Sequence, residues 1–227
     1  MIPLKQILRW DVVTWSRALY CWEKQAILQL PKTAIGLEIG AWNGGITAYF
    51  AKKGFRVICS DIETISEETR NFHQQIKVDH LIDYQIFSAT QIPYPEHHFD
   101  FVVFKSVLGA IGRNGRIEAQ QKALEEMRRV LKPGGMLFFA ENLSGSILHR
   151  FTRRWFISWG KRWRYVSLKE MENFLAEFQT LEIHSTGFFS AFVPKPTWLK
   201  NLLARLDSLS TFIPKNWRYV CYGYAIK

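Results

Sequence analysis

The sequence has few of the features that tie a chain to a disulfide, a metal or a membrane span. Its three cysteines, Cys21, Cys59 and Cys221, are far apart and form no C-x-x-C pair, a usage typical of a reducing compartment. No apolar run reaches about 18 residues, so we expect no membrane-spanning helix. The N-terminus, MIPLKQILRWDVV, has no signal-peptide core or cleavage site. These absences predict a cytoplasmic protein.

Several catalytic signatures are also missing. No cluster of His, Cys and acidic residues has metal-ligand spacing, so no metal is expected, and no nucleophilic serine or catalytic cysteine motif is present. The glycine-rich stretch EIGAWNGG lacks the middle glycine of a G-x-G turn, because Trp42 occupies that position. The remaining candidate for a chemical site is a loop that binds an organic cofactor.

Positive charge is abundant but unevenly placed. The net charge is +10; residues 1–140 hold 17 Lys and Arg against 14 Asp and Glu, whereas residues 141–227 hold 13 against 6. The second part would therefore attract an anionic partner.

Short apolar runs alternate with amphipathic stretches between residues 34 and 142, which is typical of a parallel, doubly wound α/β sheet. The expected strands are 34–40, 55–61, 82–89, 101–105 and 136–142; the expected helices are 45–54, 67–78 and 117–131, with KPGG at 132–135 as a turn. Apolar residues also recur at helical spacing over residues 4–30, which predicts one or two N-terminal helices that end near Pro31.

The C-terminal part has a different pattern. We expect a basic, aromatic helix from 146, a helix at 167–178 with Ser167 and Glu170 as capping box, an amphipathic helical insert at 196–215, and late strands at 179–188 and 216–227. The predicted fold is a seven-stranded, mostly parallel Rossmann-like sheet in one structural domain. Its parts are an N-terminal helical lid (1–34), a cofactor-binding core (35–142) and an acceptor-binding region (143–227).

The first strand is followed by a loop suited to a nucleoside cofactor. Gly40 follows the strand and Gly44 opens the helix, where free N–H groups and missing side chains allow a ligand to approach the backbone. Asp61 ends the second strand, where an acid can bind ribose hydroxyls. A glycine turn alone could equally be a plain β-α connection; the acid makes cofactor binding the better interpretation.

The motifs that follow, IPYPEHHFDFVVF and EEMRRVLKPGGMLFFAEN, give residues 35–142 a succession that resembles class I S-adenosylmethionine-dependent methyltransferases with LKPGG before the fifth strand. A nicotinamide Rossmann enzyme would more usually have the full G-x-G-x-x-G. The segments FKSVLGAIGRNG and ENLSGSILHRFTRRWFISWGKRWRYV further resemble bacterial methyltransferases that accompany surface-polysaccharide biosynthesis.

The resemblance implies cofactor-binding roles for eight residues. Glu38 and the backbone of Gly40 and Gly44 would shape the pocket for the methionine end, Asp61 would bind the ribose, and Ile62 would pack on the adenine. Ser88 and Ala89 match an adenine contact, although the family usually has an acid where this chain has Ser88, and the carbonyl of Lys105 would bind the methionine amino group. From the residues alone, Glu38 could instead cap the next helix, and Ile62 could be core.

Methyl transfer requires a base only if the acceptor must lose a proton. Glu141, just after the fifth strand, and His149, whose pKa lies near neutrality, are the predicted catalytic residues. Either could instead be structural, His149 as a surface residue of a basic helix.

Residues 150–164 contain six Lys and Arg, no acid, three Trp and two Phe. The predicted substrate-binding residues are Arg150, Arg153, Arg154 and Trp155. The segment suits an anionic or lipid-linked acceptor, or a membrane surface on which Ile147, Leu148, Phe151, Trp155 and Trp159 share a helix face. RNA binding is disfavoured because no RNA-binding module is visible, and the tryptophans could also simply be core.

The sequence thus predicts a methyltransferase that uses S-adenosyl-L-methionine to modify a hydroxyl of a sugar or lipid-linked saccharide, with possible peripheral contact at the inner face of the membrane. Two alternatives stay open: a methyltransferase acting on a lipid or small aromatic metabolite, and a non-catalytic basic module with a degenerate cofactor fold. Trp42 and Ser88 favour the second alternative.

Overall fold

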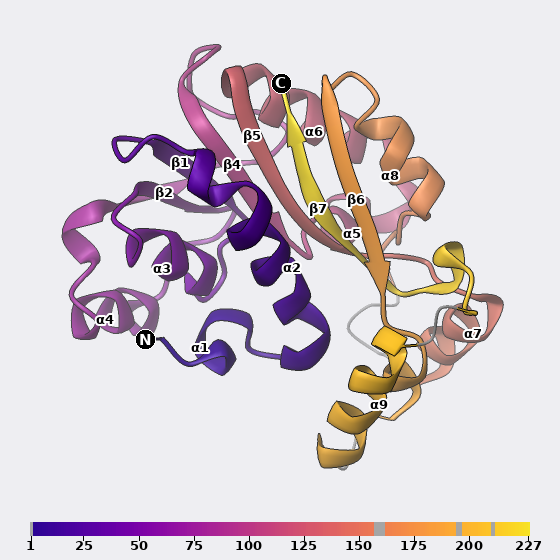
Figure 1. Ribbon diagram of the computed structural model, residues 1–227. Coiled ribbons are helices and arrows are strands. Elements are labelled where there is room, and N and C mark those ends of the chain that lie inside the picture. Colours follow the sequence, from indigo (N-terminus) through magenta and orange to yellow (C-terminus); the bar gives the residue numbers. More distant parts are fainter. Residues whose placement is uncertain (1, 157–161, 194–196, 210–211) are drawn as a thin grey trace.

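The computed structural model describes residues 2–156, 162–193, 197–209 and 212–227, with only the backbone at 154–156 and 208–209. Within this part of the chain, seven strands form one sheet in the order β3-β2-β1-β4-β5-β7-β6 (Figure 1). The strands are β1 Ile35–Ile39, β2 Arg56–Asp61, β3 Ile82–Ile86, β4 Phe99–Lys105, β5 Leu131–Asn142, β6 Thr180–Thr186 and β7 Val220–Ile226. β1 to β5 are parallel, and β7 is antiparallel to β5 and β6. The predicted fold class is confirmed.

Helices cover both faces of the sheet. They are α1 Leu4–Leu8, α2 Val12–Gln25, α3 Gly45–Ala51, α4 Glu67–Gln75, α5 Leu108–Ile111, α6 Ile117–Val130, α7 Ile147–Phe156, α8 Leu168–Phe174 and α9 Thr197–Leu209, with 3-10 turns η1 Ile27–Gln29, η2 Asp79–Leu81, η3 Arg113–Gly115, η4 Phe189–Phe192 and η5 Lys215–Trp217. α2 and α3 pack on one face, and α6 and α8 on the other (Figure 1).

Local sequence explains where these helices begin. Ser66 accepts a hydrogen bond from the Thr69 N–H at 3.2 Å and so caps α4. Ser167 and Glu170 form the predicted capping box of α8. The inner side of α6 is an apolar stripe at helical spacing, which includes Leu124 and Met127.

The sheet changes winding direction between β1 and β4. β2 and β3 lie on one side of β1, and β4 and β5 lie on the other. The carboxyl ends of β1 and β4 therefore border the crevice in which parallel α/β sheets bind ligands.

The LKPGG segment belongs to the start of β5. Leu131 pairs with Phe99 and Met136 pairs with Phe101, so residues 132–135 bulge out of the ladder. The predicted turn is thus a bulge inside a strand, with Gly134 at φ +75°.

The N-terminal helix α2 is joined to the last strand. The Trp22 indole N–H donates to the Gly223 carbonyl at 2.8 Å, and its fully buried ring lies 5.8 Å from that of Phe138. Tyr219, just before β7, donates to Asp11 and is 3.1 Å from the hydroxyls of Thr14 and Ser190. The body of α2 is therefore part of the core, and the predicted lid role of residues 1–34 stays a prediction.

We predict that Trp22→Ala lowers the free energy of unfolding by about 3–5 kcal/mol, because it leaves a large cavity and an unpaired buried carbonyl. Urea unfolding measures the change. Trp198→Ala is the control: that indole is 68% exposed, so its removal should cost less than about 1 kcal/mol. Equal costs for the two substitutions would contradict the core role of Trp22.

Candidate cofactor site at the carboxyl ends of the strands

The loop after β1 requires glycine at two positions. Gly40 has φ +68°, and a Cβ there would lie 2.6 Å from a methyl of Val107. Gly44 has φ +64°, and a Cβ there would meet the ring of His73 at 2.5 Å. The backbone of the loop is thus held close to α4 and to the start of α5, in a conformation that a larger residue could not adopt without strain.

Trp42 takes a left-handed conformation between these glycines, at φ +45°. Its N–H donates to the Asp61 carboxylate at 2.8 Å, and its ring lies 5.4 Å from the ring of Trp10. The indole is 58% exposed and turned toward the N-terminal segment. The hydrogen bond and the ring contact offset the backbone strain of a non-glycine residue here.

Glu38 is buried and serves the start of α3. One of its carboxylate oxygens accepts from the Thr47 N–H at 2.7 Å and from the Thr47 hydroxyl. Burial raises the pKa of Glu38 to about 7, although the bonds from Thr47 and the charge of Lys105 lower it. The helix-capping alternative therefore describes the observed contacts, and Glu38 would shape the pocket through the loop.

Asp61 and Ile62 lie together at the end of β2. Besides Trp42, Asp61 accepts from the Ile62 N–H at 2.7 Å, and Ile62 is 70% exposed. Asp61 borders a cavity of about 860 Å³ between the N-terminal segment, the β1–α3 loop and α4, whose lining includes Gln6, Arg9, Trp42, Asn43, Thr69 and Phe72. Of the predicted cofactor residues, Asp61 alone lines this cavity.

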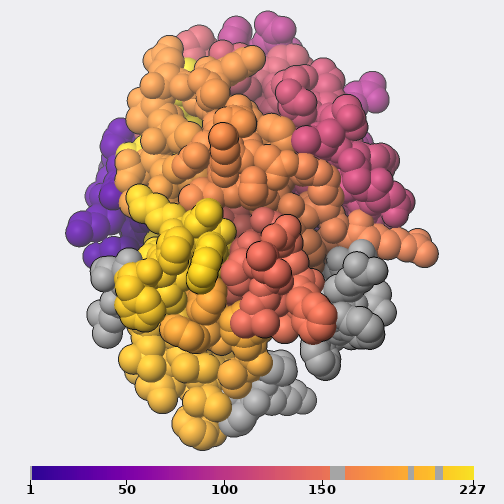
Figure 2. Space-filling model, turned by 90° about the vertical axis from the view of Figure 1, so that its right-hand side faces the viewer, coloured from indigo at the N-terminus to yellow at the C-terminus, as the bar shows by residue number. Residues whose placement is uncertain are grey.

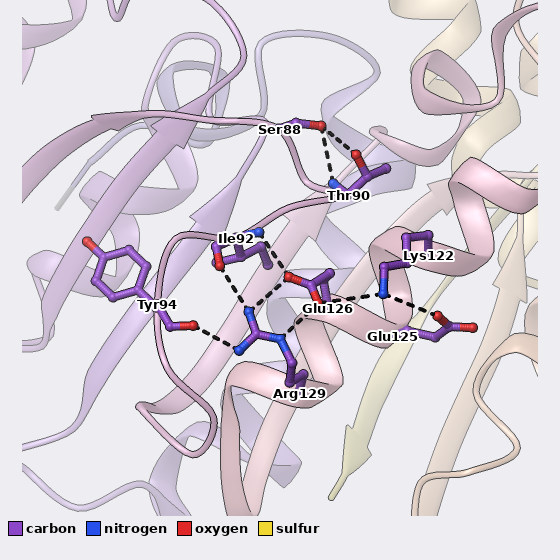
Figure 3. Close-up of polar contacts among 8 residues, drawn as sticks. All are labelled: Ser88, Thr90, Ile92, Tyr94, Lys122, Glu125, Glu126 and Arg129. Carbon is purple, nitrogen blue, oxygen red and sulfur yellow. Dashed lines mark hydrogen bonds and ion pairs between the residues drawn. The ribbon is translucent and has the colours of Figure 1, made fainter.

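Ser88 and Ala89 are half-buried after β3. The Ser88 hydroxyl accepts from the Thr90 N–H at 3.2 Å and lies 2.8 Å from the Thr90 hydroxyl (Figure 3). Ser88 thus closes its own turn. The hydroxyl oxygen could still accept a bond from an amino group, and the predicted adenine contact stays a prediction.

The loop that carries Ser88 is fixed from α6. Arg129 donates to the carbonyls of Ile92 and Tyr94 at 2.9 Å, and Glu126 accepts from the Ile92 N–H at 3.0 Å (Figure 3). Arg129 and Glu126 also pair with each other at 2.8 Å. Three backbone groups of the β3–β4 loop are therefore satisfied by a single ion pair on a neighbouring helix.

Lys105 ends β4 between two indole rings. Its ammonium lies 3.5 Å from the ring centre of Trp10 and 4.8 Å from that of Trp15. Loss of water lowers the pKa of Lys105 to about 7, while Glu38 and Glu141 raise it. The sequence predicts a role only for the Lys105 carbonyl. It does not predict the indole pair, because residues 10 and 15 reach the end of β4 only through the tertiary fold.

Glu141, predicted as a base, is fully buried and holds the loop after β4. One oxygen accepts from the N–H groups of Val107 and Leu108 at 2.8 and 2.7 Å, and the other from that of Asn142 at 2.8 Å. Burial raises its pKa to about 7, against these three bonds and Lys105. These contacts favour a positioning role over proton abstraction from an acceptor.

His149, the second predicted base, is buried among aromatic rings. One ring nitrogen is 2.8 Å from the Ser146 hydroxyl and the other 3.1 Å from the Phe188 carbonyl, and the ring stacks on Phe192 at 4.4 Å. Burial lowers its pKa to about 4. A neutral imidazole with both nitrogens engaged packs α7 onto the fold, so we do not include His149 among the candidate bases.

The predicted substrate-binding residues separate on α7. Arg150 is exposed, whereas Arg153 points inward, donating to the Leu143 carbonyl at 2.6 Å and lying over the ring of Tyr165 at 4.2 Å. Arg153 thus braces the chain after β5, and its predicted substrate-binding role stays a prediction. The side chains of Arg154 and Trp155, and all of Trp159, lie outside the described residues.

No group of three His, Cys, Asp or Glu side chains among the described residues is arranged to hold a metal ion.

We predict a pH-dependent cost for Glu141→Gln. Between pH 4.5 and 7 the folded protein keeps a proton on Glu141 that the unfolded chain has released, so this group's contribution to stability falls as the pH rises. Glutamine removes that dependence. The cost of the substitution should therefore shrink with rising pH, by at most about 1.4 kcal/mol per pH unit, as urea unfolding at pH 5, 6 and 7 would show.

Glu126→Gln is the matched control. Arg129 lowers the pKa of Glu126, so both states are ionised from pH 5 to 7 and the cost should be constant. A constant cost for Glu141→Gln as well would mean that Glu141 is already ionised at pH 5.

Residues 37–139 match a family described as a methyltransferase domain. Among similar curated proteins is the ubiquinone/menaquinone biosynthesis C-methyltransferase UbiE of Hydrogenovibrio crunogenus, 36% identical over 109 residues, or 46% of this chain and 41% of that protein. Another is a glycine/sarcosine/dimethylglycine N-methyltransferase of Actinopolyspora halophila, 29% identical over 116 residues, or 50% of this chain and 19% of that protein. The chain thus spans less than half the length of these relatives.

Solved structures share the fold over nearly the whole chain. Geranyl diphosphate C-methyltransferase from Streptomyces coelicolor, in complex with Mg²⁺, geranyl diphosphate and S-adenosyl-L-homocysteine, has a TM-score of 0.67 and 11% identity, covering 93% of this chain and 78% of that one. The [4+2]-cyclase SpnF has a TM-score of 0.66 and 16% identity, covering 93% and 80%. Because a cyclase shares it, the fold alone does not define the reaction.

The family match carries more weight than the fold, because it covers the loop after β1, Asp61 and the β4 and β5 strands in one segment. Residues 37–139 are therefore similar in sequence, and not only in fold, to methyltransferase domains.

Proposed function

We propose that this protein transfers the methyl group of S-adenosyl-L-methionine to a hydroxyl of a sugar or lipid-linked saccharide that carries negative charge. The observation that carries the methyl-donor part is the pairing of the Gly40–Gly44 loop with Asp61 inside a methyltransferase domain. The two glycines let the loop turn tightly against Val107 and His73 at the end of β1, and Asp61 offers carboxylate oxygens beside this loop. Gly40, Asp61, Ile62, Ser88, Ala89 and the Lys105 carbonyl would hold the cofactor.

Bound S-adenosyl-L-methionine supplies an electrophilic methyl group on a sulfonium whose leaving group is neutral. The chain's own task is then mostly alignment of the acceptor behind that methyl group, which can remove several kcal/mol of the barrier. Ser106 and Asn142 lie at this edge, joined by a 2.6 Å hydrogen bond between their side chains. They present polar groups at the ends of β4 and β5, where an acceptor would be positioned.

A hydroxyl acceptor also needs a base, and Lys105 suits this role better than Glu141 or His149. Its amine is enclosed by indole rings at the end of β4, and its pKa of about 7 leaves part of it neutral near neutral pH. The two residues predicted from the sequence have their side-chain atoms engaged by neighbouring groups.

For the acceptor, we favour a hydroxyl of a sugar or lipid-linked saccharide. The support is the basic, aromatic stretch 150–164 with its surface-polysaccharide resemblance, and the exposed Arg150 near the end of β5. A phosphate or pyrophosphate group on the acceptor would match this charge.

A second candidate is methylation at carbon of a lipid that has an apolar chain and an anionic head group. It is favoured by the relatives: UbiE is named a C-methyltransferase of quinone biosynthesis, and the S. coelicolor enzyme holds geranyl diphosphate. With a carbon nucleophile, Lys105 would not have to remove a proton from a hydroxyl.

We predict that the intact protein binds S-adenosyl-L-methionine and its demethylated product in calorimetry, and that Asp61→Ala weakens both by about ten-fold or more. The reason is the lost charge-assisted hydrogen bonds to the ribose. Glu63→Ala is the control, because Glu63 is an acid of the same cavity that has no predicted ribose contact. Its affinity for both ligands should stay unchanged. Unchanged affinity in Asp61→Ala would refute the ribose role, and no binding at all by folded protein would leave the non-catalytic alternative.

We predict that Lys105→Met lowers methyl transfer to a hydroxyl by about 100-fold or more while cofactor binding persists, since the Lys105 carbonyl remains. In the wild type, transfer should rise as the pH rises through about 7, because the neutral amine is the base. A variant with unaltered rate and pH profile would exclude Lys105 from catalysis.

The acceptor classes separate in one assay. Protein, methyl-labelled cofactor and a bacterial lipid extract are incubated, and the organic phase is then treated with mild acid, which cleaves a sugar from a lipid pyrophosphate. Label that moves to the aqueous phase supports the saccharide, whereas label that stays organic supports the lipid.

A further inference from the structure

One face of the molecule carries large apolar side chains outward. It is formed by α7, the segment 212–219 and α9, which lie next to one another in Figure 2, in salmon, yellow and amber. The apolar face comprises Ile147, Leu148, Trp198, Leu202, Phe212 and Trp217, with exposed fractions of 77, 53, 68, 47, 77 and 49%.

Both helices have a distinct inner side. On α7, His149 and Arg153 point inward. On α9, Ala204 and Asp207 are buried. The exposed residues lie on the opposite sides at helical spacing, so these helices are amphipathic with the apolar side turned away from the protein.

The parts of the apolar face are held together by η4. The Ser146 N–H at the start of α7 donates to the Trp217 carbonyl at 3.2 Å, and the Trp217 ring stacks on Phe188 at 6.3 Å. Phe188 and Phe189 donate their N–H groups to Asp207 of α9 at 2.9 Å. These contacts join residues that are far apart in sequence into one surface.

The sequence segments that carry the apolar face are basic. The stretches 143–165 and 187–219 contain eleven Lys and Arg and one acid, Asp207. That acid is 4% exposed and bonded to backbone. Arg150 and Lys215 are exposed beside the apolar residues.

We propose that the apolar face binds the surface of a bilayer containing anionic lipids, with its indole and phenyl rings at the headgroup level and Arg150 and Lys215 against lipid phosphates. A second copy of the chain fits less well, because a symmetric contact would set like charges against each other. None of the described helices is long and apolar enough to cross a membrane, so the contact is with the surface.

The apolar face also lies at the edge where the acceptor would enter. Asn142 ends β5, and α7 begins at Ile147, so the candidate site and the apolar face share the carboxyl end of the sheet. The binding itself requires no methyl transfer and is measured without cofactor, so its failure and that of the proposed function are separable.

Flotation with vesicles tests the proposal. The full chain should float with vesicles of phosphatidylcholine and phosphatidylglycerol (about 7:3) and not with phosphatidylcholine alone, and the bound fraction should fall in high salt. Ile147→Ser with Trp217→Ser should lower the vesicle affinity by about ten-fold or more. Arg150→Glu with Lys215→Glu should do the same for anionic vesicles.

The control is Leu28→Ser with Lys32→Glu. Both side chains are exposed, Leu28 at 82%, and both precede β1 at the opposite end of the sheet. This variant should float as the wild type does. Wild-type protein that stays unbound, equal flotation of all variants, or sedimentation that shows a dimer lost in Ile147→Ser with Trp217→Ser would each overturn the proposal.

Discussion

Three ionisable side chains inside the carboxyl edge of the sheet determine how the site is built. Glu38 of β1 and Glu141 of β5 are buried carboxylates, and Lys105 of β4, the strand between them, is the basic group that interacts with both. Burial of a carboxylate is costly unless it accepts hydrogen bonds. Both satisfy this need with N–H groups: Glu38 with that of Thr47, and Glu141 with those of Val107, Leu108 and Asn142. The same contacts that satisfy the charges place the β1–α3 and β4–α5 loops.

This arrangement links the N-terminal helices to the sheet edge. The Lys105 ammonium is enclosed by Trp10 and Trp15, so the segment before and within α2 covers the end of β4. Trp42 then packs on Trp10 from the neighbouring loop. Trp42, the non-glycine residue of the β1–α3 loop, is thus part of an aromatic layer that also encloses the Lys105 ammonium.

Much of the fold was predictable, because periodicity, glycine turns and caps act locally. The strands, α6 and the capping box of Ser167 follow from spacing that the structure confirms. The bulge at 132–135 was not evident, since it depends on the pairing of Leu131 with Phe99. For the site, Gly40 and Asp61 follow from position along the chain. The enclosed positions of Glu141 and His149 do not, because burial arises from segments such as α5 and η4 that lie elsewhere in the sequence.

The bond between Trp22 and Gly223 joins residues 201 positions apart. During synthesis, α2 is therefore made long before β7, the strand against which it packs. Until β7 is made, two large indoles, Trp15 and Trp22, lack part of the core that buries them. Non-local contacts of this kind form late in folding. α2 is consequently among the last elements to be fixed, and partly made chains expose apolar surface that can aggregate.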